Sequence, residues 1–244
     1  MDAGELLARY AEGERDFSRV NLSGADLTGA DLAGIDLTSA KLSGAYLTDA
    51  NLKGANLNQS VLRETDLSGA ILDDSSLVIA KLTGATLYKA SLVQADLGGA
   101  NLTQTDLTAA NLQEADVTRA LLSGADLEDG ILTQANLWGV DLSRANLRGA
   151  DLREAMLRGA DLSRAILQGA DLTGAKLYSA ILNGANLRDA VLCHANLTQA
   201  DLSSANLRGA NFTDADLTEV IFNRAILIGA VLPIPAVPGS GGAG

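Results

Sequence analysis

The one cysteine of the chain, Cys193, stands next to its one histidine, His194. A thiol beside an imidazole is a pairing used in nucleophilic catalysis, and both groups also bind metals. Such a pair needs a third group to orient the base, and a zinc site needs further ligands. The sequence offers no other cysteine or histidine. We therefore expect both residues to be solvated surface residues, and we predict no metal site and no cofactor.

Motifs that hold phosphate or a catalytic metal are also missing from the sequence. It contains no G-x-x-x-x-G-K-[ST], no H-E-x-x-H and no G-x-G-x-x-G between a strand and a helix. Stretches such as "RGADL" are typical of turns rather than of phosphate loops. We assign no catalytic residue and predict that the chain is not an enzyme.

A period of five organises the sequence, as in "ANLRGADLREAMLRGADLSRA" at residues 145–165. From Phe17 to Leu232 every fifth position is large and apolar, and Leu fills 40 of these 44 positions. On a helix, steps of five would rotate successive leucines by about 140° and form no stripe. On a continuous strand, successive leucines would point to opposite faces. Neither regular structure buries the leucines together.

A short extended piece followed by a corner, repeated in every pentad, does bury them. In the extended piece each Leu points inward together with the small residue two places before it, most often Ala, whereas the Asp or Asn between them points outward. The other two residues form the corner, and Gly is enriched at the second, where a type II turn needs a positive φ. The sequence therefore predicts an all-β solenoid.

Stretches such as "DLSRANLRGADL" and "ANLTQADLSSANL" resemble the A(D/N)LXX motif of the pentapeptide repeat family. The resemblance covers residues 17–232. It implies a right-handed quadrilateral β-helix with four pentads per coil, and hence about 11 coils. The opening "GELLARYAEGERDF" is also similar to that of cyanobacterial members of the family, including one linked to suppression of heterocyst differentiation.

The ends of the chain depart from the repeat, as the ends of a solenoid must. Asp2 can cap a short helix whose Leu6, Leu7 and Tyr10 share one face. Prolines near the C-terminus cannot donate to a ladder and stop the stack. We expect three segments: an N-terminal helical cap at 1–16, the β-helix at 17–232 and a flexible Pro- and Gly-rich tail at 233–244.

Residues 20 apart should be vertical neighbours on the rod. Trp138, Arg158 and Tyr178 then share one outward corner position on three consecutive coils, with Met156 beside them. An Arg between two aromatic residues, with a Met adjacent, has the composition of an interface hot spot. We predict a protein-interaction patch there. The alternative is a cation–π ladder that satisfies itself on a solvated face.

A second outward column is basic. It carries Arg148, Arg188 and Arg208, which could bind phosphate, but interleaved Asp residues argue against this. Carboxylates one coil apart could share a proton or hold a cation. The same column position recurs throughout the repeat, so we expect local hydrogen bonds near the corners instead. These pairs are Asp141 with Asp161, Asp151 with Asp171 and Asp106 with Asp126.

The charge of the chain limits its partners. The formal net charge of −12 disfavours direct contact with nucleic acid or an anionic membrane. No apolar run is long enough to span a bilayer, and the opening residues lack the apolar region of a secretory signal. With a single cysteine, the composition suits a reducing compartment, and we predict a cytoplasmic location.

We therefore predict a non-enzymatic scaffold, a rigid acidic rod that binds a protein partner, in bacterial and specifically cyanobacterial regulation. The alternative, which the family resemblance permits, is protection or inhibition of DNA gyrase by imitation of duplex DNA, as in quinolone resistance. Residues 20–139 hold six Lys or Arg against fifteen Asp or Glu, so the first half is acidic. We expect a monomer, or a weak homodimer formed through an end coil.

Overall fold

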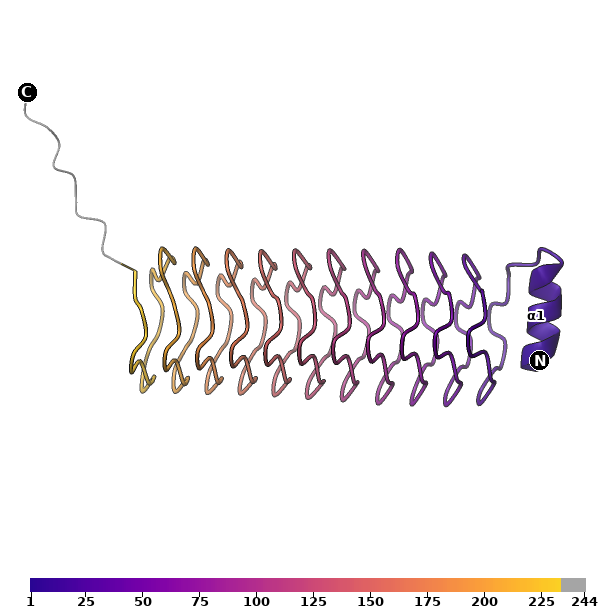
Figure 1. The fold of residues 1–244 in the computed structure, drawn as a ribbon, viewed down its shortest axis with the longest axis horizontal. Helices are drawn as coiled ribbons and strands as arrows, with labels where there is room; N and C mark the ends of the chain where they lie inside the picture. Colours follow the sequence, from indigo (N-terminus) through magenta and orange to yellow (C-terminus); the bar gives the residue numbers. More distant parts are fainter. Residues whose placement is uncertain (234–244) are drawn as a thin grey trace, which may run out of the picture.

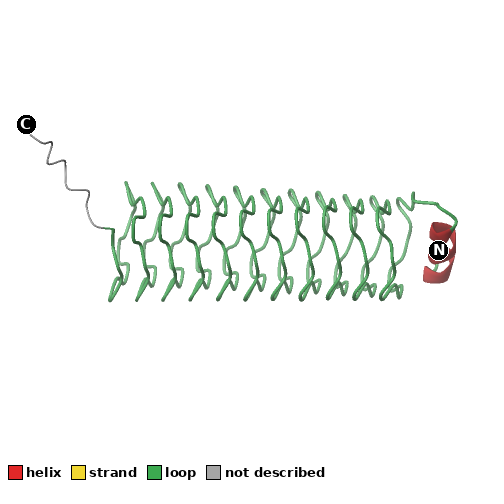
Figure 2. Cartoon of the chain, turned by 45° about the horizontal axis from the view of Figure 1, so that its top comes forward, coloured by secondary structure: helices red, strands yellow, loops and turns green. Residues whose placement is uncertain are grey.

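The computed structural model describes residues 1–233, which form a rod of stacked coils (Figure 1). One end of the rod carries α1, Ala3–Ala11, which is the only helix among the described residues. The rest of this range consists of turns, isolated β-bridges and irregular backbone (Figure 2). No helix in the described range is long and apolar enough to cross a membrane. The repeats, rather than regular helices or long strands, therefore build the molecule.

Each coil pairs with the next through parallel bridges between residues 20 apart. The bridges recur at every fifth position, from Asp16–Asp36 to Asn211–Val231. Each bridge is isolated, and residues 1–233 contain no strand of several residues. The reason is geometric, because a corner in every pentad leaves room for one bridging residue on each side. Four successive bridges complete one coil, which makes a four-sided β-solenoid.

The hydrogen bonds around Leu147 show how one side is joined to the next coil. The Leu147 N–H donates to the carbonyl of Ile166 at 2.7 Å, and the Ile166 N–H donates to the carbonyl of Ala145 at 2.9 Å. At the corner, the Ala150 N–H donates to the Leu147 carbonyl at 3.2 Å and closes a turn. This pattern stacks each pentad on the pentad 20 residues later and keeps the central Leu residues in one buried column, as the family resemblance implies.

The core is a continuous column of Leu and Ala. The central residues from Phe17 to Phe212 are at most 1 % exposed. Hydroxyl residues replace Ala at four buried positions, and each donates to a backbone carbonyl; Ser60, for example, donates to Leu57 at 2.7 Å. No buried side-chain polar atom in the described range lacks a partner. The four positions are Ser60, Thr65, Ser75 and Thr105.

The second corner position has a positive φ on every pentad from Arg19 to Gly229. More than half of the residues at this position are not glycine, and their φ lies between +53° and +61°. A left-handed conformation is unfavourable for residues with a Cβ, and most of all for a β-branched one such as Ile79. The corner is therefore imposed by the hydrogen bonds between coils.

The helix α1 lies against the first coil. Asp2 caps it by accepting from the Glu5 N–H at 2.8 Å. Leu6 is fully buried in the core, and the Tyr10 hydroxyl donates to the carbonyl of Ala33 at 2.7 Å. At the opposite end Leu232 is about half exposed, at 49 %. The predicted tail at 233–244 lies, apart from its first residue, outside the described residues.

Candidate protein-interaction surface

Three consecutive coils present an aromatic and cationic surface. Met156 bridges Asn136 on the preceding coil and Lys176 on the following one. The first corner position lies two residues after each of these. On the three coils it holds Trp138, Arg158 and Tyr178, which belong to the predicted interaction patch. We call this surface, together with Arg119 of the coil before it, the Trp138 patch; on the three coils it comprises Asn136, Trp138, Met156, Arg158, Lys176 and Tyr178.

A shallow groove lies at the centre of the Trp138 patch. Its volume is about 310 Å³, and it is lined by Asn136, Trp138, Met156 and Arg158. Trp138 is 42 % exposed and Met156 is 45 % exposed. The structure thus brings three of the four predicted patch residues together around one apolar hollow, and Tyr178 adjoins it through Arg158.

The stacking of cations on the aromatic rings differs from the expected arrangement. We expected Arg158 to lie between Trp138 and Tyr178. Instead, the Arg158 guanidinium lies over the Tyr178 ring, 5.3 Å from its centroid, and Trp138 is covered by Arg119 at 4.5 Å. Arg119 was not predicted, because vertical neighbours were expected at equal corner positions 20 residues apart, whereas Arg119 occupies the second corner position of the preceding coil. The backbone hydrogen bonds at the corner show the same offset of one position, because the Arg119 N–H donates to the Trp138 carbonyl at 2.9 Å.

The basic column of Arg148, Arg188 and Arg208 is less free than the Trp138 patch. Each backbone N–H in this column donates to the Asn two residues before it, at 3.2–3.4 Å. The Arg188 guanidinium pairs with the carboxylate of Asp189 at 3.1 Å. One interleaved acidic residue, Asp189, is therefore in contact with the column, and phosphate binding by this column stays a prediction.

Outward Asp and Asn side chains cap the corners that follow them. Asp161 accepts from the Ser163 N–H at 2.8 Å, and Asp141 accepts from the Ser143 N–H at 2.9 Å. This is the geometry of an Asx turn, and it explains why Asp or Asn is preferred there. The Arg153 guanidinium on Asp151 holds the pKa of that carboxyl below its usual range. The carboxylates one coil apart thus serve local hydrogen bonding, and no cluster in the described range could hold a metal ion.

Cys193 and His194 occupy the two positions of one corner. His194 has a φ of +58°, and its Nδ1 lies 3.8 Å from a carboxylate oxygen of Asp214 on the next coil. Cys193 is partly exposed and unpaired. An imidazole beside one carboxylate at this distance is a weak surface contact, and we give it no chemical role.

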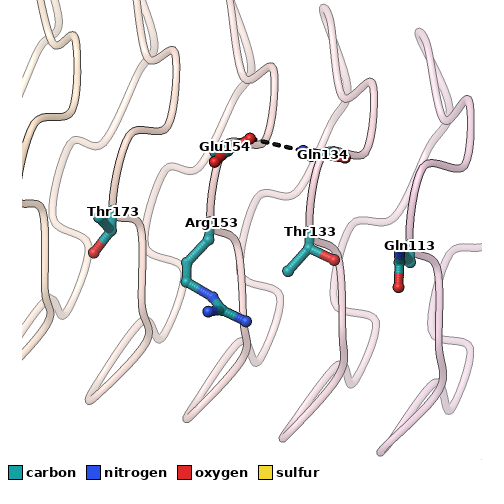
Figure 3. Close-up of a pocket in the computed structure, with 6 residues that line it drawn as sticks. All are labelled: Gln113, Thr133, Gln134, Arg153, Glu154 and Thr173. Carbon is teal, nitrogen blue, oxygen red and sulfur yellow. Dashed lines mark hydrogen bonds between the residues drawn. The ribbon is translucent and has the colours of Figure 1, made fainter.

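A second hollow, of about 530 Å³, lies on another part of the rod (Figure 3). Its polar groups are engaged with one another: Gln134 donates to Glu154 at 2.7 Å, and Arg153 donates to Asp151 at 2.8 Å. This hollow is open and polar, and we assign it no ligand. The residues drawn around it are Gln113, Thr133, Gln134, Arg153, Glu154 and Thr173.

Comparison with known proteins identifies solved relatives. HetL, a pentapeptide repeat protein involved in heterocyst differentiation regulation from the cyanobacterium Nostoc sp. strain PCC 7120, is 40% identical. The match covers 97% of this chain and 99% of HetL, with a TM-score of 0.49. Rfr23, a pentapeptide repeat protein from the cyanobacterium Cyanothece 51142, is 35% identical. This match covers 48% of this chain and 63% of the Rfr23 chain, with a TM-score of 0.17.

A more distant match is QnrB1, a plasmid-mediated fluoroquinolone resistance protein, at 16% identity. The match covers 86% of this chain and 90% of the QnrB1 chain, with a TM-score of 0.36. No curated protein sequence matches the chain significantly.

The family described as pentapeptide repeats matches in eight copies, which together extend from residue 16 to residue 232. Members of this family fold as right-handed quadrilateral β-helices and are typically structural or interaction scaffolds. The resemblance seen in the repeats, and in the opening of the chain, is confirmed. The chain belongs to the pentapeptide repeat family.

Proposed function

We propose that the chain is a rigid scaffold that binds a protein partner through the Trp138 patch. The observation that carries this proposal is the apolar groove between Trp138 and Met156, flanked by guanidinium groups. Trp, Tyr and Arg dominate the energetics of protein interfaces, because they bury a large area while keeping polar contacts. Trp138 and Met156 together line one exposed apolar hollow, and a contiguous apolar patch of this kind can mark a protein interaction site.

The similarity to HetL supports a regulatory role in a cyanobacterial setting, since HetL is involved in heterocyst differentiation regulation and is 40% identical over nearly the whole chain. We extend the proposal to the architecture: about 11 coils, with α1 as the cap of the first layer. The burial of Leu6 at one end supports the cap. The exposed apolar residues of the last coil, such as Leu232, are compatible with a monomer or with a weak homodimer at that end. We propose a cytoplasmic location.

The test is capture of a partner by the immobilised chain from a cyanobacterial lysate, compared with a double variant, Trp138→Ala with Arg158→Ala. We expect the double variant to lose the captured protein, because it removes both the ring and the cation beside it. The matched control is Tyr88→Ala, since Tyr88 is 41 % exposed and also lies beside a cation, Lys89. Equal capture by all three proteins would reject the Trp138 patch as the binding surface.

Imitation of DNA stays the alternative proposal, supported by the acidic residues 20–139. Duplex DNA carries about one charge per 1.7 Å of its axis, a far higher density than this chain offers. A supercoiling assay with DNA gyrase, with and without a fluoroquinolone, separates the two proposals. Inhibition or protection by the wild-type chain at micromolar concentration would favour the DNA mimic, whereas no effect would remove it.

A further inference from the structure

The Trp138 patch carries hydrogen-bond donors without acceptors, and positive charge without counter-ions, in the described chain. Arg119, Arg158 and Lys176 form no ion pair with any carboxylate in residues 1–233. Glu154, on the neighbouring corner, accepts instead from Gln134 at 2.7 Å. Arg158 therefore lines the apolar groove without a counter-ion, and two further cations without counter-ions, Arg119 and Lys176, adjoin its walls, in a chain whose formal net charge is −12.

Two backbone N–H groups of the Trp138 patch also lack acceptors. On the first of the three coils, the Trp138 N–H donates to Asn136 at 3.3 Å, in the usual Asx turn. On the next two coils Met156 and Lys176 replace Asn; an ammonium cannot accept, and the weakly accepting Met156 sulfur receives no hydrogen bond here. The N–H groups of Arg158 and Tyr178 consequently have no acceptor in the part of the chain that the structure describes.

Elsewhere the fold can compensate for such a replacement. The N–H of Val78, which follows Ser76, donates to Asn58 of the preceding coil at 2.8 Å. In the Trp138 patch the residues that correspond to Asn58 are Trp138 and Arg158, and neither carries an acceptor. Two donors on successive coils, spaced about 4.8 Å apart, are thus free to bond to solvent or to a partner.

The aromatic groove distinguishes these donors from others like them. Val61 also replaces Asx and leaves the Arg63 N–H without an acceptor in residues 1–233. Arg63 stacks on no aromatic ring in that range, whereas Arg158 lies over Tyr178. A free donor beside a cation therefore recurs on the rod, but in the Trp138 patch it also adjoins an apolar groove that can hold a side chain.

We infer that the partner docks an acidic segment on the Trp138 patch, with a carboxylate taking the place of the missing Asx oxygen. This inference rests on the proposed function. A carboxylate can accept from the free N–H groups and pair with Arg158 or Lys176, and such charge-assisted hydrogen bonds are stronger than neutral ones. An apolar side chain next to the carboxylate fills the groove between Trp138 and Met156. A nucleic acid is a poorer occupant, because the acidic residues 20–139 repel a long polyanion.

Trp138 is the only tryptophan of the chain, so its fluorescence reports directly on the groove. The probe is a short synthetic peptide in which Glu alternates with Leu, compared with an analogue that carries Gln in place of Glu. We expect a saturable change of Trp138 emission with the acidic peptide, and at least about tenfold weaker binding of the Gln analogue. Added salt should weaken only the acidic peptide, because salt screens exposed charges.

Met156→Asp is the decisive variant, because it supplies the missing carboxylate within the chain. It restores the Asx position for the Arg158 N–H and places negative charge in the groove. We expect a thermal midpoint at or above that of the wild type, together with loss of binding of the acidic peptide. The matched control is Arg63→Ala, since Arg63 holds the equivalent corner position on another side of the rod, beside a free donor but no aromatic ring. It should leave binding unchanged.

Several outcomes would overturn the inference. They are equal binding of the Glu and Gln peptides, unchanged binding by Met156→Asp, and binding of a single-stranded oligonucleotide as tight as that of the acidic peptide. If these occur while partner capture still depends on Trp138 and Arg158, the proposed function stands and only the acidic chemistry of the partner fails.

Discussion

Replacement of Gly149 by Ala tests the account of the corners. Gly149 has a φ of +65°, and a Cβ built on it would overlap the Oδ1 atom of Asp129 on the preceding coil. Gly159 is the matched comparison, because its φ is +63° and no atom lies within 4 Å of its Cβ position. Both substitutions introduce a left-handed Ala, and only Gly149→Ala also displaces a neighbour.

The two contributions can be estimated separately. A left-handed conformation costs a residue with a Cβ about 1–2 kcal/mol relative to Gly. The reduced entropy of the unfolded chain returns about 0.4–1 kcal/mol of this, so Gly159→Ala should lower the free energy of unfolding by about 1 kcal/mol. Moving the Asp129 carboxylate away from a preferred rotamer costs a further 0.5–1.5 kcal/mol, roughly. Gly149→Ala should therefore lose about 2 kcal/mol in total.

Thermal unfolding followed by circular dichroism measures the difference. For a chain of this size about 1 kcal/mol shifts the midpoint by about 2–4 °C, so Gly149→Ala should melt several degrees below Gly159→Ala. Adding Asp129→Ala should recover that difference in the Gly149→Ala background alone, which gives a coupling energy of about 1 kcal/mol. Equal midpoints for the two Ala variants, or no rescue by Asp129→Ala, would refute the packing argument.

Three other changes test the core, the corners and the carboxylates. Leu147→Ala should destabilise the chain by about 2.7–5 kcal/mol, because Leu147 is fully buried between two coils; an unchanged urea midpoint would contradict a packed core. Ile79→Asn should raise the thermal midpoint, because a β-branched residue at φ +59° is strained and Asn tolerates this region. Hydrogen bonds from Ser68 and Arg153 lower the pKa of Asp66 and Asp151 in the folded state. Their stabilisation is present above the unfolded pKa of about 4 and lost as the pH falls through the folded values, so a pH series of thermal midpoints should decline below about pH 4.

Much of the fold could be predicted from the sequence, because one short unit repeats the same packing problem. The period of five alone predicts that Leu147 points inward and that the second corner position, as at Gly149, needs a positive φ. The family resemblance adds the coil of four pentads, and the bridges between residues 20 apart agree with it. This prediction required no helix or strand of several residues, and in the described range the structure contains one such element, α1.

The candidate site was only partly predictable. Vertical alignment of equal positions on successive coils brought Trp138, Arg158 and Tyr178 together, but it could not show which cation covers which ring. That choice depends on side-chain direction at the corner, where the second position of one coil reaches the first position of the next, as in Arg119 with Trp138. The lack of an acceptor for the Arg158 and Tyr178 N–H groups could not be predicted, because the sequence does not show the Asx hydrogen bonds that satisfy this N–H on other pentads.

In a chain built of near-identical pentads, the positions that depart from the motif carry the information about function. Leu and Ala recur in the core because each coil poses the same packing problem, so they distinguish no part of the rod from another. Met156 and Lys176 give up a hydrogen bond that Asp or Asn would supply at no packing cost, since the position faces solvent. The same loss recurs at other corners, such as the one after Val61, and in the Trp138 patch it coincides with an apolar groove and exposed cations. A gain in stability with a loss of binding, in the single variant Met156→Asp, is therefore the result that would tie these departures to a partner rather than to chance.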